Sequence, residues 1–357
     1  MSQPWDPDHG LSREELSARL AAALAERTAR FGASPEVRWF DEGWDCDVFV
    51  VTDKVGSRWL CKLPKRSNVQ PWLHKEAHIL SAFEDAQHRF VPQLGWTSWE
   101  PTGESNSGGT PATGGLPYDW MAISFAPGVP LLPRLAEVDP ARLGRSYGHR
   151  VGAVHRVSPG GIGERPRSVE FDPCDLARNA DSAIVALRRH VAGDVVDRVE
   201  RMIERVRVRP AEDVAPVFIH GDLFPEHVFF EPDTWDVVGL IDWADSTWGD
   251  PAADFCLLSW LLGDAFLDAA LDAYGAFGTN PLTEVRAGRD GAGRSEAELF
   301  GRTEVDLREL RRRAIVRGAV IGIHDVEVAE KGAPNVPLRQ RVEVLERRVR
   351  EGWLERV

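Results

Sequence analysis

The sequence lacks the features of a secreted, membrane-spanning or disulfide-stabilised protein. Its four cysteines lie far apart and form no C-x-x-C pair, which favours reduced thiols over a disulfide framework or a zinc site. The longest apolar stretch, near residues 255–262, is much shorter than the ~20 residues that a membrane-spanning helix needs. The first ten residues contain neither a basic nor an apolar segment, so no signal peptide is expected. We therefore predict a soluble, cytoplasmic protein that does not bind membranes.

The sequence also contains fewer basic residues than acidic ones. The 357 residues include 43 lysines and arginines against 56 aspartates and glutamates, which gives a formal charge of −13. A nucleic-acid-binding protein needs a basic surface to neutralise phosphates, so no nucleic-acid partner is expected. An acidic surface favours cationic partners instead, although acidity also serves solubility. Hydrophobic residues make up 43% of the chain, and this content at this length indicates a folded protein of two lobes.

The first part of the chain is predicted to form a β-rich lobe over residues 1–126. A capping box at residues 12–15 precedes leucines at helical spacing, which predicts a helix to about Arg30. Short runs rich in Val, Trp and Phe then predict an antiparallel meander. The expected elements are strands at 36–40, 47–52, 58–63 and 119–125, a helix at 73–83 and a flexible insertion at 101–117.

The second part, residues 127–357, is predicted to form a larger, mainly helical lobe, so the fold class is α+β. Helical stripes recur over 143–154 and 191–206, and residues 255–274 are apolar enough to predict one buried helix. Short strands at 217–219 and 237–241 bracket a polar loop, which predicts a hairpin at 217–243. Residues 279–300 are predicted to form a mobile loop, and a last helical region is expected from about Asp306.

The polar loop of this hairpin contains the residues with the clearest chemistry. The sequence HGDLFPEH occupies residues 220–227, and Asp242 follows after an apolar strand. Protein kinases show a similar order in H-R-D-x-x-x-x-N and D-F-G, with His227 here in place of the Asn. Phosphoryl transfer needs one carboxylate to orient the attacking hydroxyl and two ligands to hold Mg²⁺. An HGD triplet alone is most often a turn, but the spacing of Asp222, His227 and Asp242 favours a catalytic loop.

Two residues upstream fit the same chemistry. Lys62 interrupts the apolar strand at 58–63 on the face opposite to Cys61, and Glu76 follows on the predicted helix. Kinases use such a strand lysine on the phosphates and pair it with a helix glutamate. Taken alone, Lys62 could be an edge lysine and Glu76 a solvated charge. Lys65 and Arg66, just after the strand, are weaker candidates for phosphate contacts.

The glycine-rich loop of protein kinases is missing. No G-x-G-x-x-G occurs, and the corresponding turn reads DEGWDCDV over residues 41–48. This departure argues against a protein kinase. Gly43 and Asp45 of this turn are the candidates that would lie beside a nucleotide.

These motifs resemble the aminoglycoside/macrolide phosphotransferase superfamily, the antibiotic kinases. The resemblance is carried by HGDLFPEH, by GLIDWADSTWGDPAADF at 239–255 and by ISFAPGVPL at 123–131. GWDCDVFVV at 43–51, RWLCKLPKR at 58–66 and the His that closes the catalytic loop are most similar to macrolide 2′-kinases. The resemblance runs from about Asp41 to the last helices, without the two insertions.

The resemblance implies a bilobal, protein-kinase-like fold and a role for each matching residue. Asp222 would be the catalytic base, and His227 and Asp242 would be ligands of Mg²⁺. Lys62 with Glu76 would position the phosphates of GTP or ATP, although those enzymes often have Arg at the place of Lys62. We expect a monomer that transfers the γ-phosphate to the 2′-hydroxyl of a macrolide and so confers antibiotic resistance.

Other carboxylates are candidates for the amine of a cationic antibiotic. Asp245 lies just beyond Asp242, and Asp325 and Glu327 lie on a late helix that borders the acceptor pocket in this superfamily. Asp250 is interpreted as a helix cap, and Asp254 is expected to brace the HGD loop. The histidines on helices are interpreted as structural residues; they are His149, His155 and His324.

Three alternatives remain open at this point. The acceptor could be an aminoglycoside or another small molecule of the same superfamily. The histidines and aspartates of the hairpin could instead form the metal cluster of a hydrolase, with His220, Asp222, His227 and Asp242 as ligands. A nucleotide-binding pseudokinase is the third alternative, and the intact Asp222 and Asp242 argue against it.

Overall fold

The computed structural model describes residues 6–27, 31–32, 34–85, 88–99, 115–157, 173–208, 214–278, 306–332 and 337–357. Most of the predicted insertion at 101–117 and the whole predicted loop at 279–300 lie outside these residues. The chain divides into two compact units. Unit 1 contains the described residues up to Gly128 together with Val238–Asp245, and unit 2 contains the other described residues from Val129 onward.

Unit 1 is built on a five-stranded sheet of order β1-β2-β3-β5-β4. Every pairing in it is antiparallel, so the predicted meander is confirmed. The strand β4 was not predicted, because its four residues are only half-buried and show no alternation. The strands are β1 (Glu36–Glu42), β2 (Cys46–Thr52), β3 (Arg58–Pro64), β4 (Leu94–Thr97) and β5 (Met121–Ser124).

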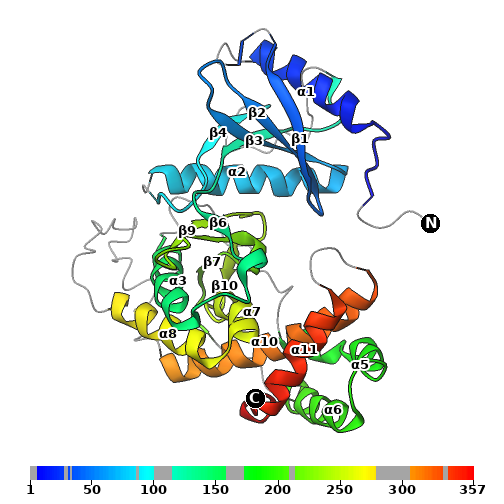
Figure 1. The fold of residues 1–357 in the computed structure, drawn as a ribbon, viewed down its shortest axis with the longest axis vertical. Coiled ribbons are helices and arrows are strands. Elements are labelled where there is room, and N and C mark those ends of the chain that lie inside the picture. Colours follow the sequence, from blue (N-terminus) through cyan, green and yellow to red (C-terminus); the bar gives the residue numbers. More distant parts are fainter. Residues whose placement is uncertain are drawn as a thin grey trace, which may run out of the picture. The chain divides into compact units, whose positions relative to one another are not determined.

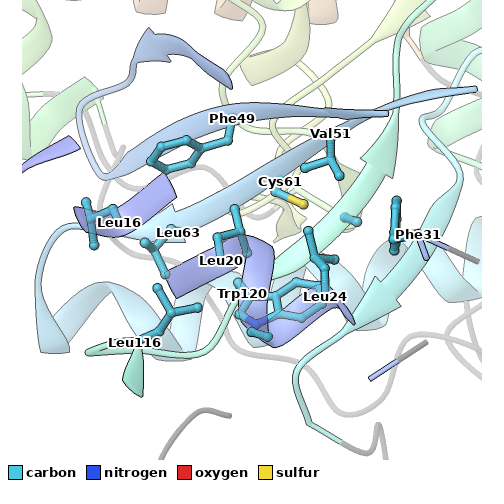
Figure 2. Close-up of a cluster of buried hydrophobic side chains, with 12 residues drawn as sticks. Leu16, Leu20, Leu24, Phe31, Phe49, Val51, Cys61, Leu63, Leu116 and Trp120 are labelled. Carbon is cyan, nitrogen blue, oxygen red and sulfur yellow. The ribbon is translucent and has the colours of Figure 1, made fainter. Parts of the chain in front are cut away.

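The helix α1 (Arg13–Arg27) covers one face of this sheet. The predicted capping box is confirmed: the Ser12 N–H donates to Glu15 Oε2 at 2.8 Å, and the Glu15 N–H donates to Ser12 Oγ at 3.2 Å. The apolar stripe of α1 is buried against side chains of the sheet, as Figure 2 shows. This core includes Leu16, Leu20, Leu24, Phe49, Val51, Cys61, Leu63 and Trp120.

The helix α2 (Gln70–Asp85) lies on the opposite side of the sheet from α1 (Figure 1) and follows a short helix η1 (Ser67–Val69). Side chains alternate between the faces of a strand. Cys61 and Leu63 of β3 therefore pack under α1, while Lys62 between them points toward α2. This alternation is what places a charged side chain next to a buried glutamate of α2, Glu76.

Unit 2 is mainly helical, as predicted. In Figure 1 α3 (Pro140–Val154) runs beside α8 (Asp264–Gly278), and the long α10 (Leu307–Glu330) contacts α7 (Ala253–Leu262). The α+β fold class is thus confirmed. The other helices of unit 2 outside the HGD loop are η3 (Leu132–Arg134), α4 (Pro173–Arg178), α5 (Asp181–Leu187), α6 (Gly193–Arg207), α11 (Leu338–Arg350) and η6 (Leu354–Arg356).

The prediction of one buried helix over 255–274 is wrong, because the run is divided between α7 and α8. Gly263 separates them with φ at +89°, a backbone conformation that side chains disfavour. The guanidinium group of Arg348 fills the space beside it, so that a Cβ on Gly263 would lie 2.8 Å from Arg348 Nη1. Apolar residues continue on both sides of Gly263, so the hydrophobic pattern of the sequence did not indicate a helix end there.

Short strands in unit 2 hold the two ends of the predicted catalytic loop. The strand β7 (Val217–Ile219) pairs with β10 (Thr247–Gly249), and β6 (Val129–Pro130) pairs with β8 (Val228–Phe230). The loop between β7 and β8 contains the helical turn η5 (Pro225–His227), and β9 (Val237–Leu240) follows. The predicted strands at 217–219 and 237–241 are thus confirmed to within one residue. The predicted hairpin between them is wrong, because β7 pairs with β10 while β9 belongs to the separate sheet β6-β8-β9. Of the described helices, none has the length and apolar character required to cross a membrane.

Candidate active site

Three of the predicted site residues meet in unit 1. Lys62 Nζ lies 2.6 Å from Glu76 Oε2 and 2.9 Å from Asp242 Oδ1. Lys62 comes from β3, Glu76 from α2 and Asp242 from the segment after β9. The Glu76 side chain is 2% exposed, whereas the Asp242 side chain is 42% exposed. The pairing of Lys62 with Glu76 was expected from the kinase motif, whereas the contact of Lys62 with Asp242, 180 residues further along the chain, was not predicted.

The charge of Lys62 is stabilised by this environment. Burial alone would lower the pKa of Lys62, but the charges of Asp242 and Glu76 outweigh burial and raise that pKa above its usual value. The ammonium group is thus cationic throughout the physiological range of pH. A fixed cation is suited to contact a phosphate chain, and a partly exposed carboxylate beside it is suited to hold the metal ion that phosphoryl transfer requires.

The backbone of Asp242 adopts an uncommon conformation, with φ at +66°. Aspartate tolerates this left-handed region better than most residues, but the conformation still has to be held by its surroundings. The next residue supplies the anchor: Trp243 is fully buried, its N–H donates to Glu76 Oε1 at 3.3 Å, and its Nε1 donates to Leu240 O at 2.9 Å. Glu76 therefore positions both Lys62 and the backbone beside Asp242.

The turn between β1 and β2 is tied to the end of β3. Lys65 Nζ donates to the Gly43 carbonyl oxygen at 2.7 Å, and Arg66 forms an ion pair with Asp45. Lys65 and Arg66 were weak candidates for phosphate contacts, and the structure engages both with the turn instead. Gly43 and Asp45, predicted to lie beside a nucleotide, are the residues to which they bind.

In unit 2 the HGD loop is held by a buried carboxylate. Asp254, in the first turn of α7, accepts hydrogen bonds from the N–H of His220 and from the N–H of Gly221, each at 2.8 Å. The hypothesis that Asp254 braces this loop is confirmed. Asp250 caps the turn before α7, because its carboxylate accepts a hydrogen bond from the Ala252 N–H at 2.9 Å. The helix α7 itself begins at Ala253, which is later than the sequence indicated.

The brace continues to two residues whose role was missed. His155 Nε2 lies 3.0 Å from Asp254 Oδ2, and His155 Nδ1 lies 3.1 Å from the Tyr274 hydroxyl. Burial would raise the pKa of Asp254, but the hydrogen bond from His155, with further help from His220 and Gly221, holds this pKa below its usual value. His155 was interpreted only as a structural histidine, since its partners are distant in the chain.

Asp222 and His227 contact one another at the other end of the loop. His227 Nδ1 lies 2.7 Å from the carbonyl oxygen of Asp222 and 3.3 Å from its carboxylate Oδ2. Because a carbonyl oxygen only accepts, Nδ1 carries a proton, and in the neutral ring the lone pair is then on Nε2. This kind of backbone contact fixes the orientation of many metal-binding histidines.

The candidate amine-binding carboxylates are half-buried or already paired. Asp245 is half-buried three residues beyond Asp242. Asp325 forms an ion pair with Arg341 at 2.5 Å, and Glu327 forms one with Lys331 at 2.6 Å. Burial raises the pKa of Asp325 in spite of Arg341. An amine would therefore compete with cations of the chain itself at Asp325 and Glu327.

Within the described part of the chain, no three His, Cys, Asp or Glu side chains are arranged so that they could hold a metal ion by themselves. The His220 ring is fully buried, and its Nδ1 lies 3.3 Å from the N–H of Asp222. The Asp242 carboxylate is bonded to Lys62. The metal cluster required by a hydrolase is therefore not formed among these residues.

Comparison with known proteins places the chain in a family. Residues 36–289 match the phosphotransferase enzyme family. The uncharacterized protein YcbJ of Bacillus subtilis (strain 168) is 25% identical over 239 residues, which cover 66% of this chain and 73% of that protein. Among the solved structures that share the fold, two cover almost the whole length of both chains.

The first is the GDP complex of wild-type aminoglycoside 2′-phosphotransferase-IIIa, with a TM-score of 0.64 and 15% identity over 96% of this chain and 100% of that one. The second is macrolide 2′-phosphotransferase MphH from Brachybacterium faecium, with a TM-score of 0.53 and 20% identity over 93% and 97%. The predicted resemblance to this superfamily is confirmed. On the strength of the matched residues, the chain belongs to the phosphotransferase enzyme family.

Proposed function

We propose that this protein is an antibiotic kinase that transfers the γ-phosphate of GTP or ATP to the 2′-hydroxyl of a macrolide. The observation that carries the proposal is the contact of Lys62 with both Glu76 and Asp242. Kinase-like phosphotransferases need a fixed cation on the phosphates and a carboxylate for the metal ion. An ion pair that served only to stabilise the fold would not require a carboxylate that is partly exposed to solvent, as the carboxylate of Asp242 is.

Asp222 is proposed to orient the acceptor hydroxyl and to accept its proton. A carboxylate in this role must be held still, because general-base catalysis depends on geometry before it depends on pKa. The hydrogen bonds from the loop to Asp254 and the contact with His227 support this role. Lys62 is proposed to stabilise the charge that develops on the phosphate oxygens.

Asp242 and His227 are proposed as the residues that would hold Mg²⁺, which supplies further neutralisation of phosphate charge when bound. Asp242 fits this role, since Mg²⁺ prefers carboxylate oxygens. The imidazole of His227 fits less well, because nitrogen ligands suit transition metals better than Mg²⁺. The protonated Nδ1 of His227 leaves Nε2 as the coordinating atom.

The macrolide is proposed as the acceptor because of the sequence resemblance. Three tryptophans of unit 2, Trp248, Trp260 and Trp353, are core residues that are at most 6% exposed, so they give no support for an apolar acceptor pocket. An aminoglycoside is the competing acceptor. The amine of either antibiotic is proposed to bind Asp245, Asp325 or Glu327.

The test is a reaction of the full chain with GTP or ATP, a divalent cation and a panel of macrolides and aminoglycosides. We expect one macrolide to gain the mass of a single phosphoryl group, located at the 2′-oxygen by fragmentation. Phosphorylation of aminoglycosides alone would replace the macrolide by the competing acceptor. If the protein phosphorylated neither macrolides nor aminoglycosides, this result would contradict the proposal.

A matched pair of variants tests the assigned base. Asp222→Asn should lose roughly 10²-fold or more in kcat while nucleotide affinity stays unchanged. Asp233→Asn, the same substitution at an exposed position of unit 2, serves as the control. A kcat near the wild-type value in Asp222→Asn would exclude Asp222 as the base. If the wild-type protein bound the nucleotide but showed no turnover, this result would favour the pseudokinase.

A further inference from the structure

Lys65 stands out as a lysine that is almost completely buried, with 2% of its surface exposed. Lysine is rarely buried to this degree unless its ammonium group has a partner, because desolvating the charge is unfavourable. One partner here is a backbone group: Nζ donates to the Gly43 carbonyl oxygen at 2.7 Å. The Lys65 N–H also donates to the Asp45 carbonyl oxygen at 2.8 Å.

Arg66 completes the attachment of this turn. Its Nη1 donates to the Trp44 carbonyl oxygen at 3.3 Å, and its Nη2 donates to the Asp45 carboxylate. Three consecutive carbonyl oxygens of the turn, at residues 43–45, thus accept hydrogen bonds from two consecutive residues of the β3 end. The Gly43 N–H closes the turn on the Cys46 carbonyl oxygen at 3.0 Å.

The anchor is itself held from its other side by the N-terminal segment. The Asp8 N–H donates to the Lys65 carbonyl oxygen at 3.0 Å, and the Ser67 N–H donates to Asp8 Oδ2 at 3.1 Å. The Tyr118 hydroxyl donates to Asp8 Oδ1. The backbone on either side of Arg66 is therefore bound to residues that lie far away in the chain.

The direction of these bonds decides what the turn presents. In a planar trans peptide the C=O and the following N–H point in opposite directions. Since the carbonyl groups of Gly43 and Trp44 point toward Lys65 and Arg66, the N–H groups of Trp44 and Asp45 point away from them. Successive backbone N–H groups on one side of a turn form a concave site for anions such as phosphate.

We propose that Lys65 is a positioning residue for the nucleotide, because its ammonium group fixes the turn 43–46 through the Gly43 carbonyl oxygen. This inference rests on the proposed function. The chain has no G-x-G-x-x-G loop, whose mobility would have to be lost on binding. A turn that is already fixed before the nucleotide arrives does not lose this freedom, which favours affinity.

The test compares Lys65→Met with Lys54→Met, the same substitution at an exposed lysine in the next turn of the same sheet. Hydrogen exchange of the nucleotide-free protein should show faster exchange at residues 43–46 in Lys65→Met only. Calorimetric titration with GTP and ATP should show affinity weakened roughly tenfold, because a hydrogen bond to a charged group is lost. Lys65→Arg, which keeps a donor, should restore part of both properties.

Arg66→Gln is a second variant for the case that Lys65→Met does not fold. Its side chain is more exposed, and it should shift exchange and affinity in the same direction by a smaller factor. Unchanged exchange at 43–46 in both variants would overturn the inference, as would fast exchange with wild-type nucleotide affinity. Nucleotide binding that depends on Lys65 without phosphoryl transfer would instead refute the proposed function and uphold the inference.

Discussion

Lys62 can be tested through stability as well as through activity. Replacing Lys62 by Met removes the cation from Glu76 and leaves a buried carboxylate without compensation. Removing one partner of a buried pair is strongly destabilising, so we expect a loss of about 3 kcal/mol in the free energy of unfolding at pH 8. Urea unfolding measures this loss, and the double variant Lys62→Met/Glu76→Gln should recover much of it.

The same variant has a predictable pH dependence. Burial and Asp242 raise the pKa of Glu76 while Lys62 opposes them, so without Lys62 this pKa rises further. When folding raises the pKa of a group, the group stabilises the folded protein at pH values below its pKa in the unfolded chain. This stabilisation is lost as the pH rises through the pKa of the group in the folded protein. Lys62→Met should therefore approach the wild-type stability as the pH falls toward 4.5, the ordinary glutamate value. An equal loss at pH 5 and 8 would contradict this account.

The contribution of Asp254 to stability depends on pH in the opposite direction to that of Glu76. Its pKa is lowered in the folded protein, so its contribution to stability is present above the ordinary aspartate value of 3.8 and is lost as the pH falls through the lowered folded value. We expect Asp254→Asn to cost about 2 kcal/mol, since one of the two loop N–H groups loses an acceptor. The difference from wild type, followed by urea unfolding, should be constant from pH 8 to 5 and shrink below about pH 4. A difference that grows on acidification would be incompatible with the lowered pKa.

At this scale the sequence was informative where a residue broke a pattern. Lys62 could be singled out because it interrupts an apolar strand, and Asp222 and Asp242 because they match a spaced motif. Lys65 was considered only for phosphate contacts and His155 only as a structural residue, since nothing local shows which groups a buried lysine or histidine will contact. Their roles depend on partners that the fold brings from more than 20 residues away: Gly43 for Lys65, and Asp254 and Tyr274 for His155.

Among the elements, the pair formed by α3 and α8 depends on glycine. A Cβ on Gly148 would lie 2.0 Å from the Ala270 carbonyl oxygen, and one on Gly144 would lie 2.4 Å from the Phe266 carbonyl oxygen. The two helices are therefore in backbone contact at these points. Since a packed core does not yield to added atoms, we expect Gly148→Ala to cost about 3 kcal/mol.

Gly193→Ala is the matched control for this helix contact. Gly193 is the first residue of α6, and a Cβ there would meet no heavy atom within 4 Å. It should leave stability unchanged or raise it by about 0.5 kcal/mol through a less flexible unfolded chain. Thermal unfolding of both variants measures the contrast, and equal melting temperatures would show that α3 and α8 can separate without cost.

The elements themselves were largely predictable from periodicity, with errors at their ends. The strands of the meander came out within two residues of their bounds, because their alternating side chains face α1 on one side. The helix α2 extends beyond the predicted 73–83 at both ends, and its first turn contains Pro71, which is compatible with a helix start. The break at Gly263 does not show in the hydrophobic pattern, because apolar residues continue on both sides of it; the positive φ of Gly263 ends α7 there.

For the whole molecule, the excess of negative charge bears on which substrates arrive quickly. A formal charge of −13 attracts cations and repels anions at long range, and salt screens both effects over about 10 Å at 0.1 M. The proposed reaction joins a cationic antibiotic to an anionic nucleotide. The two substrates should therefore respond to ionic strength in opposite ways.

We expect kcat/KM for the antibiotic to fall by up to roughly tenfold between low and moderately high salt, since electrostatic steering enhances association by about this factor or more. Over the same range kcat/KM for GTP or ATP should stay level or rise. Steady-state kinetics at several concentrations of potassium chloride, with the other substrate saturating, measures both. An uncharged viscogen is the control, because it slows diffusion of either substrate without screening charge. If both substrates responded to salt in the same direction, the net charge would have no part in substrate capture, and the acidity of the chain would serve only its solubility.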